Sequence, residues 1–355
     1  MAFVHENEND LLFRIKMRQM SDFFTIGVDF GGTNLRVGAY AGTSELLDVI
    51  SLPTRLELGR DQVVRDMCGA IQSLMTKYEG SRRLAGIGIG SPGPLELPHG
   101  VLRNPPNLPG WDQFDLRQAV ETALGQEVVL ESDANAAALA EQVWGAGRTF
   151  GVDTLCMLTL GTGVGNGLIF DGTIWHGHTG MGGEGGHILI KEYDGAPCGC
   201  GGYGCLEQYA SATAILRMAR ERLGADAPSD AHGVYLAAVR GDERALQVFA
   251  EVGHALAVAL TALVNTLNMP LYTIGGGACE AWELFAPVMF EELRRRSYVY
   301  RLTAPDALAP DVLTPQKTYI LQAELGSGAG LLGACLLPLQ KNKNARAVAE
   351  PVAAD

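Results

Sequence analysis

"FFTIGVDFGGTNLRVGAY", residues 23–40, has the pattern of a β-hairpin and decides the fold. An apolar run reaches Asp29, a turn with two glycines follows, and a second apolar run leads away from the turn. Two antiparallel strands joined by a short turn have this pattern. Residues 154–172, "TLCMLTLGTGVGNGLIFDG", repeat it, and helical and strand patterns alternate after each hairpin. We therefore infer that one α/β unit is duplicated within the chain.

The most apolar uncharged stretch, residues 255–278, is interrupted by Asn265, Asn268 and Pro270 and ends in a glycine triplet. A buried helix followed by a buried strand fits this pattern better than a membrane-spanning helix. Elsewhere the periodicity predicts a helix over 61–78, a strand over 84–93, an irregular stretch over 97–114, a helix over 114–125, a strand running into a helix over 127–145, and a helix over 326–337.

The composition restricts the class of protein. The chain has 355 residues, 47% hydrophobic and 19% charged, enough for two domains with sizeable cores. A formal net charge of -13 argues against a nucleic-acid-binding surface over the whole molecule, because phosphate backbones are bound by excess Lys and Arg. The first residues, "MAFVHENENDLLFRIKMRQMSDF", lack the apolar core and cleavage site of a secretory signal. We expect a cytoplasmic protein with reduced thiols.

Three of the seven cysteines lie close together in "CGCGGYGC", residues 198–205, where glycines let several sulfurs converge. Three thiolates need a fourth ligand to complete a tetrahedral zinc site, and His187 precedes them. The pattern favours a site of Cys198, Cys200, Cys205 and His187. A glycine-rich loop with reduced cysteines remains the alternative, because the spacing is not a paired CxxC arrangement. The remaining cysteines stand singly among apolar neighbours, as core residues do: Cys68, Cys156, Cys279 and Cys335.

Glycine-rich turns can direct consecutive N–H groups at a phosphate without any basic side chain. The hairpins offer two such turns, "DFGGTN" at 29–34 and "LGTGVGNG" at 160–167. Hairpins use glycine for turn geometry in any case, so one turn alone is weak evidence and one turn in each repeat is stronger. The carboxylate of Asp29 could hold Mg²⁺ through water beside the phosphates.

Two other nucleotide motifs fit the sequence poorly or not at all. Gly88, Gly90 and Gly93 have the G-x-G-x-x-G spacing, but Pro92 interrupts it and a proline-rich stretch follows where a dinucleotide site needs a helix. No G-x-x-x-x-G-K-[ST] sequence occurs. The sequence therefore favours neither a Rossmann dinucleotide site nor a P-loop.

Together, "DFGGT", "SDANAAALAE", "LGTGVG", "EGGH" with "CGCGGYGCLE", and "IGGG" resemble the ROK family of bacterial sugar kinases and repressors over residues 23–338. The resemblance implies an α/β fold of two ribonuclease H-like domains, as in actin-like ATPases, with sugar and ATP in an interdomain cleft. We then expect a flexible lead-in at 1–22, a small domain of 23–135 plus 326–340, a large domain of 136–325 with a zinc loop at 187–207, and a flexible tail at 341–355.

The resemblance also assigns roles. "ESDANA" places Asp133 between a strand and a helix, where spacing alone favours a helix N-cap. The family's catalytic base lies at this position, so Asp133 is expected to accept the sugar hydroxyl proton, with Asn135 steadying the site. The sugar-binding residues implied are Asn107, Asp133, Glu184, His187 and Glu207. The nucleotide-binding residues implied are Asp29, Gly31, Gly32, Thr33, Thr162, Gly163, Gly275, Gly276 and Gly277.

The expected function is ATP-dependent phosphorylation of the 6-hydroxyl of glucose, with ATP, Mg²⁺ and a structural Zn²⁺. If His187 binds the zinc through one nitrogen, the other becomes a fixed donor toward the sugar. Kinases for N-acetylmannosamine, allose or fructose share these motifs and remain alternatives. A non-catalytic sugar-responsive regulator is the rival from another class, although about twenty residues before the first strand are too few for a three-helix DNA-binding module. We expect a homodimer that binds neither nucleic acid nor membrane.

Overall fold

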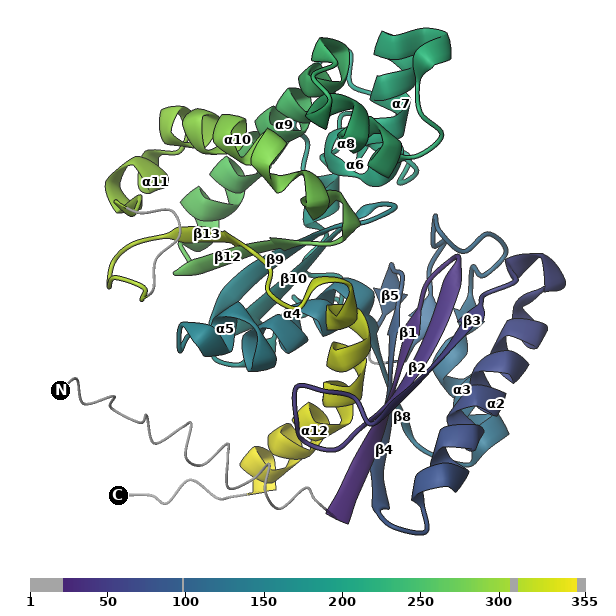
Figure 1. Ribbon diagram of the computed structural model, residues 1–355. Coiled ribbons are helices and arrows are strands. Elements are labelled where there is room, and N and C mark those ends of the chain that lie inside the picture. Colours follow the sequence, from purple (N-terminus) through teal and green to yellow (C-terminus); the bar gives the residue numbers. More distant parts are fainter. Residues whose placement is uncertain (1–21, 98, 307–311, 350–355) are drawn as a thin grey trace. The chain divides into compact units, whose positions relative to one another are not determined.

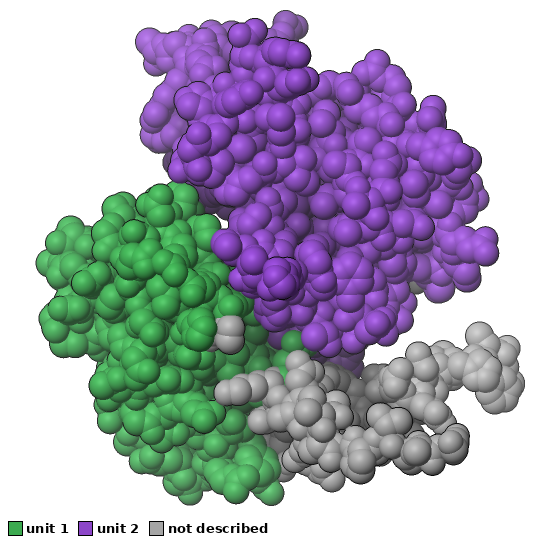
Figure 2. Space-filling model, turned by 180° about the vertical axis from the view of Figure 1, so that it is seen from behind, with its two compact units in different colours: residues 1–136, 330–355 green, residues 137–329 purple. Residues whose placement is uncertain are grey.

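The computed structural model describes residues 22–97, 99–306 and 312–349. The chain divides into two compact units, coloured separately in Figure 2. Unit 1 comprises Met1–Ala136 and Gly330–Asp355, and unit 2 comprises Ala137–Ala329. The chain therefore passes between the two units twice, at residues 136–137 and 329–330.

Unit 1 contains a five-stranded sheet with the order β3-β2-β1-β4-β8 (Figure 1). The first three strands are antiparallel, whereas β1, β4 and β8 run parallel. The alternating apolar residues of β1 and β2 pack in a core with two amphipathic helices, α2 and α3. The bounds are β1 Phe23–Phe30, β2 Asn34–Tyr40, β3 Asp48–Pro53, α2 Arg60–Tyr78, β4 Arg83–Ser91, α3 Leu116–Leu124 and β8 Val128–Ser132.

Unit 2 repeats the arrangement with a sheet of order β11-β10-β9-β12-β13. Its first hairpin is antiparallel, and β12 and β13 continue parallel to β9. If the five strands of each sheet are counted in sequence order, both sheets have the spatial order third, second, first, fourth, fifth. This shared order confirms the predicted duplication. The bounds are β9 Leu155–Leu160, β10 Val164–Phe170, β11 Thr173–Ile174, β12 Leu271–Gly275 and β13 Tyr319–Gln322.

The predicted buried helix is α9 (Glu243–Leu267), around which the core of unit 2 is built. By length and composition it could cross a membrane, but 61% of its most apolar window is buried inside the protein. The other helices of the unit are α5 Ala146–Thr149, α6 Glu207–Ala210, α7 Ala212–Leu223, α8 Ala231–Val239, α10 Trp282–Arg296 and α11 Tyr298–Thr303, and α4 (Asp133–Trp144) passes from unit 1 into unit 2.

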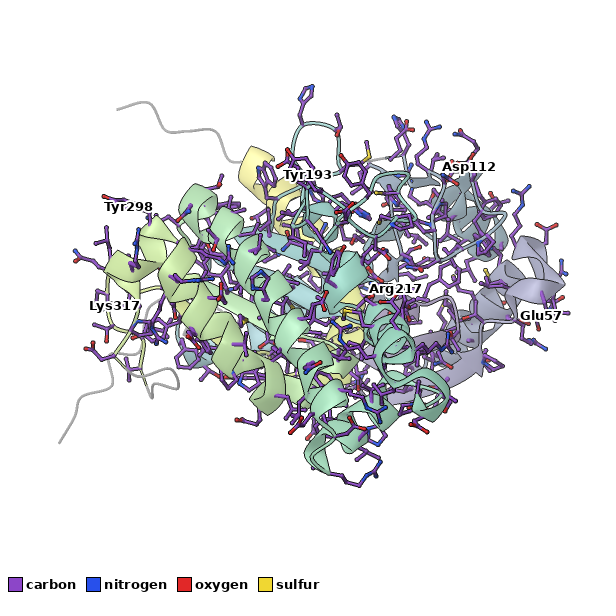
Figure 3. All side chains as sticks on the ribbon, turned by 90° about the horizontal axis from the view of Figure 1, so that it is seen from above. Glu57, Asp112, Tyr193, Arg217, Tyr298 and Lys317 are labelled. Carbon is purple, nitrogen blue, oxygen red and sulfur yellow. The ribbon has the colours of Figure 1, made fainter. Side chains whose placement is uncertain are left out.

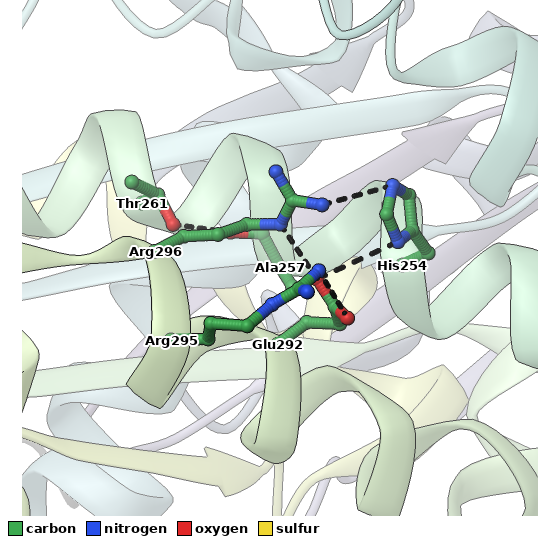
Figure 4. A network of polar contacts seen from close by, with 6 residues as sticks. All are labelled: His254, Ala257, Thr261, Glu292, Arg295 and Arg296. Carbon is green, nitrogen blue, oxygen red and sulfur yellow. Dashed lines mark hydrogen bonds and ion pairs between the residues drawn. The ribbon is translucent and has the colours of Figure 1, made fainter.

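A polar network links α10 to α9 on their solvent side (Figure 4). Glu292 accepts hydrogen bonds of 2.7 Å from both Arg295 and Arg296. Its carboxylate also lies 3.7 Å from His254 Nδ1 on α9. Arg295 and, with it, Arg296 hold the pKa of the Glu292 carboxyl below its usual value.

The C-terminal helix α12 (Ala329–Ala349) lies against the sheet of unit 1 because glycines leave room for its backbone. A Cβ at Gly27 would be 2.5 Å from the Cys335 nitrogen, and one at Gly88 would be 2.1 Å from the Ala334 carbonyl oxygen. Real Cβ atoms essentially never come within 3.0 Å of another heavy atom in this way. Gly88 of β4 therefore serves helix packing, and the described residues between β4 and α3 form only short strands and turns.

Two expectations need correction. The stretch 97–114, predicted to be irregular, contributes to a small sheet of β5 (Leu95–Glu96), β6 (Val101–Leu102) and β7 (Phe114–Asp115). Strands of two residues are too short to show alternation in a sequence. The predicted tail from residue 341 is helical as far as Ala349. Residues 1–21 and 350–355, in the remaining parts of the predicted lead-in and tail, lie outside the described residues.

Candidate active site

The turn between β1 and β2 presents two adjacent backbone N–H groups. The Gly31 N–H donates to the Asn34 carbonyl at 2.9 Å, and Thr54 braces the turn through its hydroxyl, which donates to the Gly31 carbonyl at 2.6 Å. Within the described part of the chain, the N–H groups of Gly32 and Thr33 have no protein acceptor. The turn can therefore donate two hydrogen bonds to an anion, while Gly31 shapes the turn.

The turn between β9 and β10 has the same arrangement. The Gly161 N–H donates to the Gly163 carbonyl at 3.0 Å, and the Thr213 hydroxyl donates to the Thr162 carbonyl at 2.8 Å. Thr162 and Gly163 keep N–H groups that no described protein atom accepts. Each unit thus offers one turn with two free donors in succession, and consecutive donors of this kind bind phosphates.

Asp29 is not a free carboxylate. Arg36 donates to its Oδ2 from Nη2 at 2.5 Å and from Nε at 3.1 Å, which leaves Oδ1 for another partner. The sequence analysis did not single out Arg36, although the hairpin pairing contains the signal: Asp29 and Arg36 are directly opposite in the β1–β2 register. Any Mg²⁺ held near Asp29 would therefore also be near a guanidinium.

The parallel strands of unit 1 end beside Asp133. Asp29, Gly90 and Glu131 form one row across β1, β4 and β8, and a Cβ at Gly90 would lie 3.5 Å from the Asp133 Cα. Asp133 is the first residue of α4, and its Oδ1 accepts the Ala134 N–H at 2.7 Å. The carboxylate thus lies at a helix N-terminus, at the edge where ligands bind in α/β sheets.

A buried pair supports this end of α4. The Asn135 amide donates to Glu131 Oε1 at 2.9 Å, and both side chains are almost completely buried. Asn135 Oδ1 has no hydrogen-bond donor within the described residues. Sequence analysis named Asn135 but missed Glu131, which holds its amide in place.

Asn107 lies beside the first phosphate turn. The residue is exposed, and its backbone carbonyl oxygen would be 2.9 Å from a Cβ at Gly32. The loop that carries it is closed by Asp112, labelled in Figure 3, whose carboxylate accepts the Asn104 N–H at 2.7 Å. Unit 1 thus brings one predicted sugar-binding residue next to one predicted phosphate-binding turn.

In unit 2, the ligand atoms of His187, Cys198, Cys200 and Cys205 all lie within 4.8 Å of one another. The Cys198 sulfur is 3.6 Å from His187 Nδ1, and the sulfurs of Cys200 and Cys205 are 3.8 Å apart. Sulfurs bound about 2.3 Å from a tetrahedral zinc are separated by about 3.8 Å. None of the seven cysteines forms a disulfide. The residues fit zinc, and the nitrogen of His187 that faces Cys198 is Nδ1, which leaves Nε2 directed elsewhere.

Glu207 connects the cluster of His187 and the three cysteines to the turn between β9 and β10. Its Oε2 accepts the Val164 N–H at 3.0 Å, and its Oε1 lies 3.9 Å from the Cys198 sulfur. Burial raises the pKa of the Glu184 carboxyl even though this residue keeps an exposed surface, attraction to His187 opposes the rise, and repulsion from Glu207 adds to it. The carboxylate of Glu184 is therefore close enough to the other two predicted sugar-binding residues of unit 2, His187 and Glu207, to feel their charges.

The three glycines at the end of β12, Gly275 to Gly277, differ in what surrounds them. A Cβ at Gly275 would be 2.8 Å from Met157 Cε, and one at Gly276, where φ is 91°, would be 2.5 Å from the Leu160 carbonyl oxygen. Backbone packing within unit 2 therefore requires Gly276, whereas the nearest atom to a Cβ at Gly275 is the flexible end of a methionine side chain. A Cβ at Gly277 would meet nothing within 4 Å, so only Gly277 has space in front of it for a ligand.

Comparisons with known proteins show the family of the chain. Residues 25–341 match the ROK family. The chain is 34% identical to a glucokinase from Halalkalibacterium halodurans, over 92% of this chain and 98% of the relative. It is 35% identical to a glucokinase from Thermotoga maritima, over 87% and 95% of the two chains. A solved ROK family glucokinase from Streptomyces griseus, in complex with glucose and AMPPNP, superposes with a TM-score of 0.73 at 31% identity, over 89% of this chain and 99% of that one.

More distant relatives have other names. The chain is 30% identical to an N-acetylmannosamine kinase from Shigella boydii, over 88% of this chain and 97% of the relative. It is 28% identical to a xylose repressor from Caldicellulosiruptor bescii, over 77% and 71% of the two chains. The match to the Streptomyces griseus structure confirms the fold predicted from the sequence, that of the actin-like ATPases with two ribonuclease H-like domains.

Proposed function

The chain belongs to the ROK family, and from this premise we propose that it transfers the γ-phosphoryl group of ATP to the 6-hydroxyl of glucose. That it is a kinase for a hexose follows from the glucokinase relatives, which match nearly its whole length. Glucose as the preferred hexose, the 6-hydroxyl as the acceptor and Asp133 as the base are the finer steps of the proposal.

The observation that carries the proposal is the matched pair of turns. Gly32 with Thr33, and Thr162 with Gly163, each present two unused N–H donors, one pair per unit. In a chain of net charge -13, backbone donors are a way to bind ATP phosphates without a basic surface. Mg²⁺ would compensate the charge that develops on the phosphates, with Asp29 Oδ1 as the nearby oxygen that Arg36 does not use.

Asp133 is the proposed general base. Its carboxylate would take the proton from the sugar hydroxyl as the hydroxyl oxygen forms its bond to the γ-phosphorus and the bond to ADP breaks. Glu131 holds the side-chain amide of Asn135, two residues after Asp133, which keeps the start of α4 fixed. Asn107 from unit 1, and Glu184, His187 and Glu207 from unit 2, are the proposed sugar ligands.

Replacement of Asp133 by Asn tests the base. We expect kcat to fall by about 10² to 10⁴, since a positioned base typically contributes this factor. Folding and binding of the ATP analogue AMPPNP should be unchanged. Asp115→Asn is the matched control, because Asp115 caps α3 through the Gln118 N–H and asparagine caps equally well. Turnover near that of the wild type in a folded Asp133→Asn protein would remove Asp133 from this role.

The zinc proposal has a readout other than activity. We expect one zinc per chain by elemental analysis, and loss of this zinc together with lower thermal stability in Cys200→Ala. Cys68→Ala is the control, because Cys68 is a buried single cysteine of α2. Freshly purified active protein without stoichiometric metal would contradict the proposal.

The choice of sugar is tested by comparing glucose with N-acetylmannosamine on one preparation. The carboxylates and imidazole of unit 2 are proposed to bind hydroxyls near the anomeric carbon, where each unpaired polar group costs about 1–3 kcal/mol. Glucose should therefore have the higher kcat/KM. A preference for the N-acetyl sugar would overturn the substrate but leave the kinase, whereas sugar binding without any ATP turnover would favour a regulator. The cytoplasmic location and the homodimer remain predictions, and sedimentation analysis tests the latter.

A further inference from the structure

Unit 2 contains a cavity of about 660 Å³ that none of the proposed catalytic residues lines. It is formed by residues 191–197 within the loop that precedes Cys198, by α6 and α7, and by one residue of α9. Ligand sites commonly have volumes of roughly 300 to 1,000 Å³, so the cavity can hold a molecule of the size of a sugar phosphate.

Cations surround one aromatic ring in this cavity. Lys191 Nζ lies 5.9 Å from the centroid of Tyr209, and the Arg217 guanidinium lies 6.0 Å from it. The Tyr209 ring is fixed, because its hydroxyl accepts the Ala196 N–H at 2.8 Å and the side chain is 5% exposed. Within the described chain, the hydroxyl proton of Tyr209 has no acceptor. Arg217, labelled in Figure 3, projects from α7.

The two arginines of the cavity form ion pairs, whereas its lysine does not form one with any residue that the structure describes. Arg217 pairs with Glu221 at 2.6 Å, and Arg222 pairs with Glu251. Lys191 forms no ion pair within the residues that the structure describes, and its ammonium is exposed. The cavity therefore has a free ammonium, a free hydroxyl donor and two guanidiniums whose charges are only partly shared.

Carboxylates also line the cavity, and they favour a phosphate that carries hydroxyl groups over a bare oxyanion. Glu221, Glu251 and the exposed Asp194 would repel a bare oxyanion, but they accept hydrogen bonds from hydroxyl groups. A ligand that combines a phosphate with several hydroxyls uses both sets, with its phosphate near Lys191 and its hydroxyls near the carboxylates.

We propose that this cavity is a second binding site, separate from the catalytic residues, for a sugar phosphate. Its walls include Pro197, which precedes the zinc ligand Cys198, and Tyr209, which lies two residues after Glu207. A bound sugar phosphate would thus contact the chain next to Cys198 and close to Glu207. The inference does not depend on which hexose the enzyme phosphorylates.

Calorimetric titration of the full-length protein with glucose 6-phosphate tests the proposal. Saturating glucose and ADP are present throughout, so that the catalytic residues are occupied. We expect saturable binding with one molecule per chain to persist, and inorganic phosphate to bind at least about tenfold more weakly, because it lacks the hydroxyls. Absence of saturable binding under these conditions would overturn the proposal, and equal binding of inorganic phosphate would overturn the sugar part of it.

Variants of Lys191 locate the site. Lys191→Gln should weaken binding of glucose 6-phosphate about tenfold or more, because a charge-assisted hydrogen bond is lost. Lys191→Arg should keep most of the affinity. Lys317→Gln is the matched control, since Lys317 donates to the Ala304 carbonyl at 3.0 Å and does not line the cavity. Lys191 is exposed and Lys317 is partly exposed, so these substitutions should preserve folding. Binding that Lys191→Gln leaves unchanged would refute the assignment even where the enzyme is an active kinase.

Discussion

Gly277→Ala separates a ligand contact from protein packing. The added Cβ would meet no protein atom within 4 Å, and Gly277 does not have the positive φ of Gly276. The protein can therefore accept alanine without strain, and the free energy of unfolding should stay the same or rise by about 0.4–1 kcal/mol. A nucleotide that lies against Gly277 would instead be overpacked by the new methyl group.

The expected size of this effect follows from overpacking. An inserted methyl group in a filled site costs about 1–3 kcal/mol. Since each 1.36 kcal/mol is a factor of ten, the KM for ATP should rise by about 5-fold to 150-fold. The KM for the sugar should be unchanged. A coupled assay of ADP release at varied ATP measures this, and calorimetry with AMPPNP gives the affinity directly.

The control is Gly80→Ala, where an added Cβ also meets nothing within 4 Å. This variant should match the wild type in every kinetic constant. If Gly277→Ala is as stable as the wild type and keeps its affinity for both ATP and AMPPNP, the expectation that Gly277 contacts the nucleotide is refuted.

Three further predictions concern stability and use chemical denaturation. Gly88→Ala should destabilise the protein by about 1–3 kcal/mol because its Cβ collides with a backbone carbonyl of α12, whereas Gly69→Ala, in open space on α2, should stabilise it by up to about 1 kcal/mol. Burial raises the pKa of Glu141, so wild type should lose stability relative to Glu141→Gln as pH rises from about 4.5 through the raised pKa. Hydrogen bonds from arginine lower the pKa of Glu292, so the stability that wild type holds over Glu292→Gln should be present above about pH 4.5 and vanish as pH falls through the lowered pKa.

The repeated hairpins were the most predictable part of the fold. A run of apolar residues, a glycine turn and a second run leave few alternatives, and both turns formed where the sequence predicted them. The strands β5, β6, β7 and β11 were not predictable, because each has two residues and pairs with a neighbour rather than following a period of its own. Local pattern thus identified the long elements and missed those that tertiary pairing creates.

The candidate site divides in the same way. The cluster of His187 with Cys198, Cys200 and Cys205 could be predicted because these residues are close in sequence and chemically distinctive. The role of Arg36 could not be predicted without knowing which residue lies opposite Asp29 in the hairpin. The role of Glu131 could not be predicted without knowing that Asn135 is buried beside it. Glu141 shows why long-range contacts could not be predicted. Its carboxylate accepts hydrogen bonds from the N–H groups of Glu324 and of the residue after it, and no local sequence pattern connects these distant segments.

The position of α12 on the sheet of unit 1 sets an order on biosynthesis. The ribosome makes the strands of that sheet first, then all of residues 137–329, and only then the helix that lies on Gly27 and Gly88. At roughly 5–20 residues per second, the glycine-lined face waits on the order of ten seconds or more for its cover. Unit 2, a continuous segment, can fold within that interval. The half of the protein that is made first is therefore the half completed last, and a chain interrupted before residue 330 carries an unfinished sheet with an exposed apolar face.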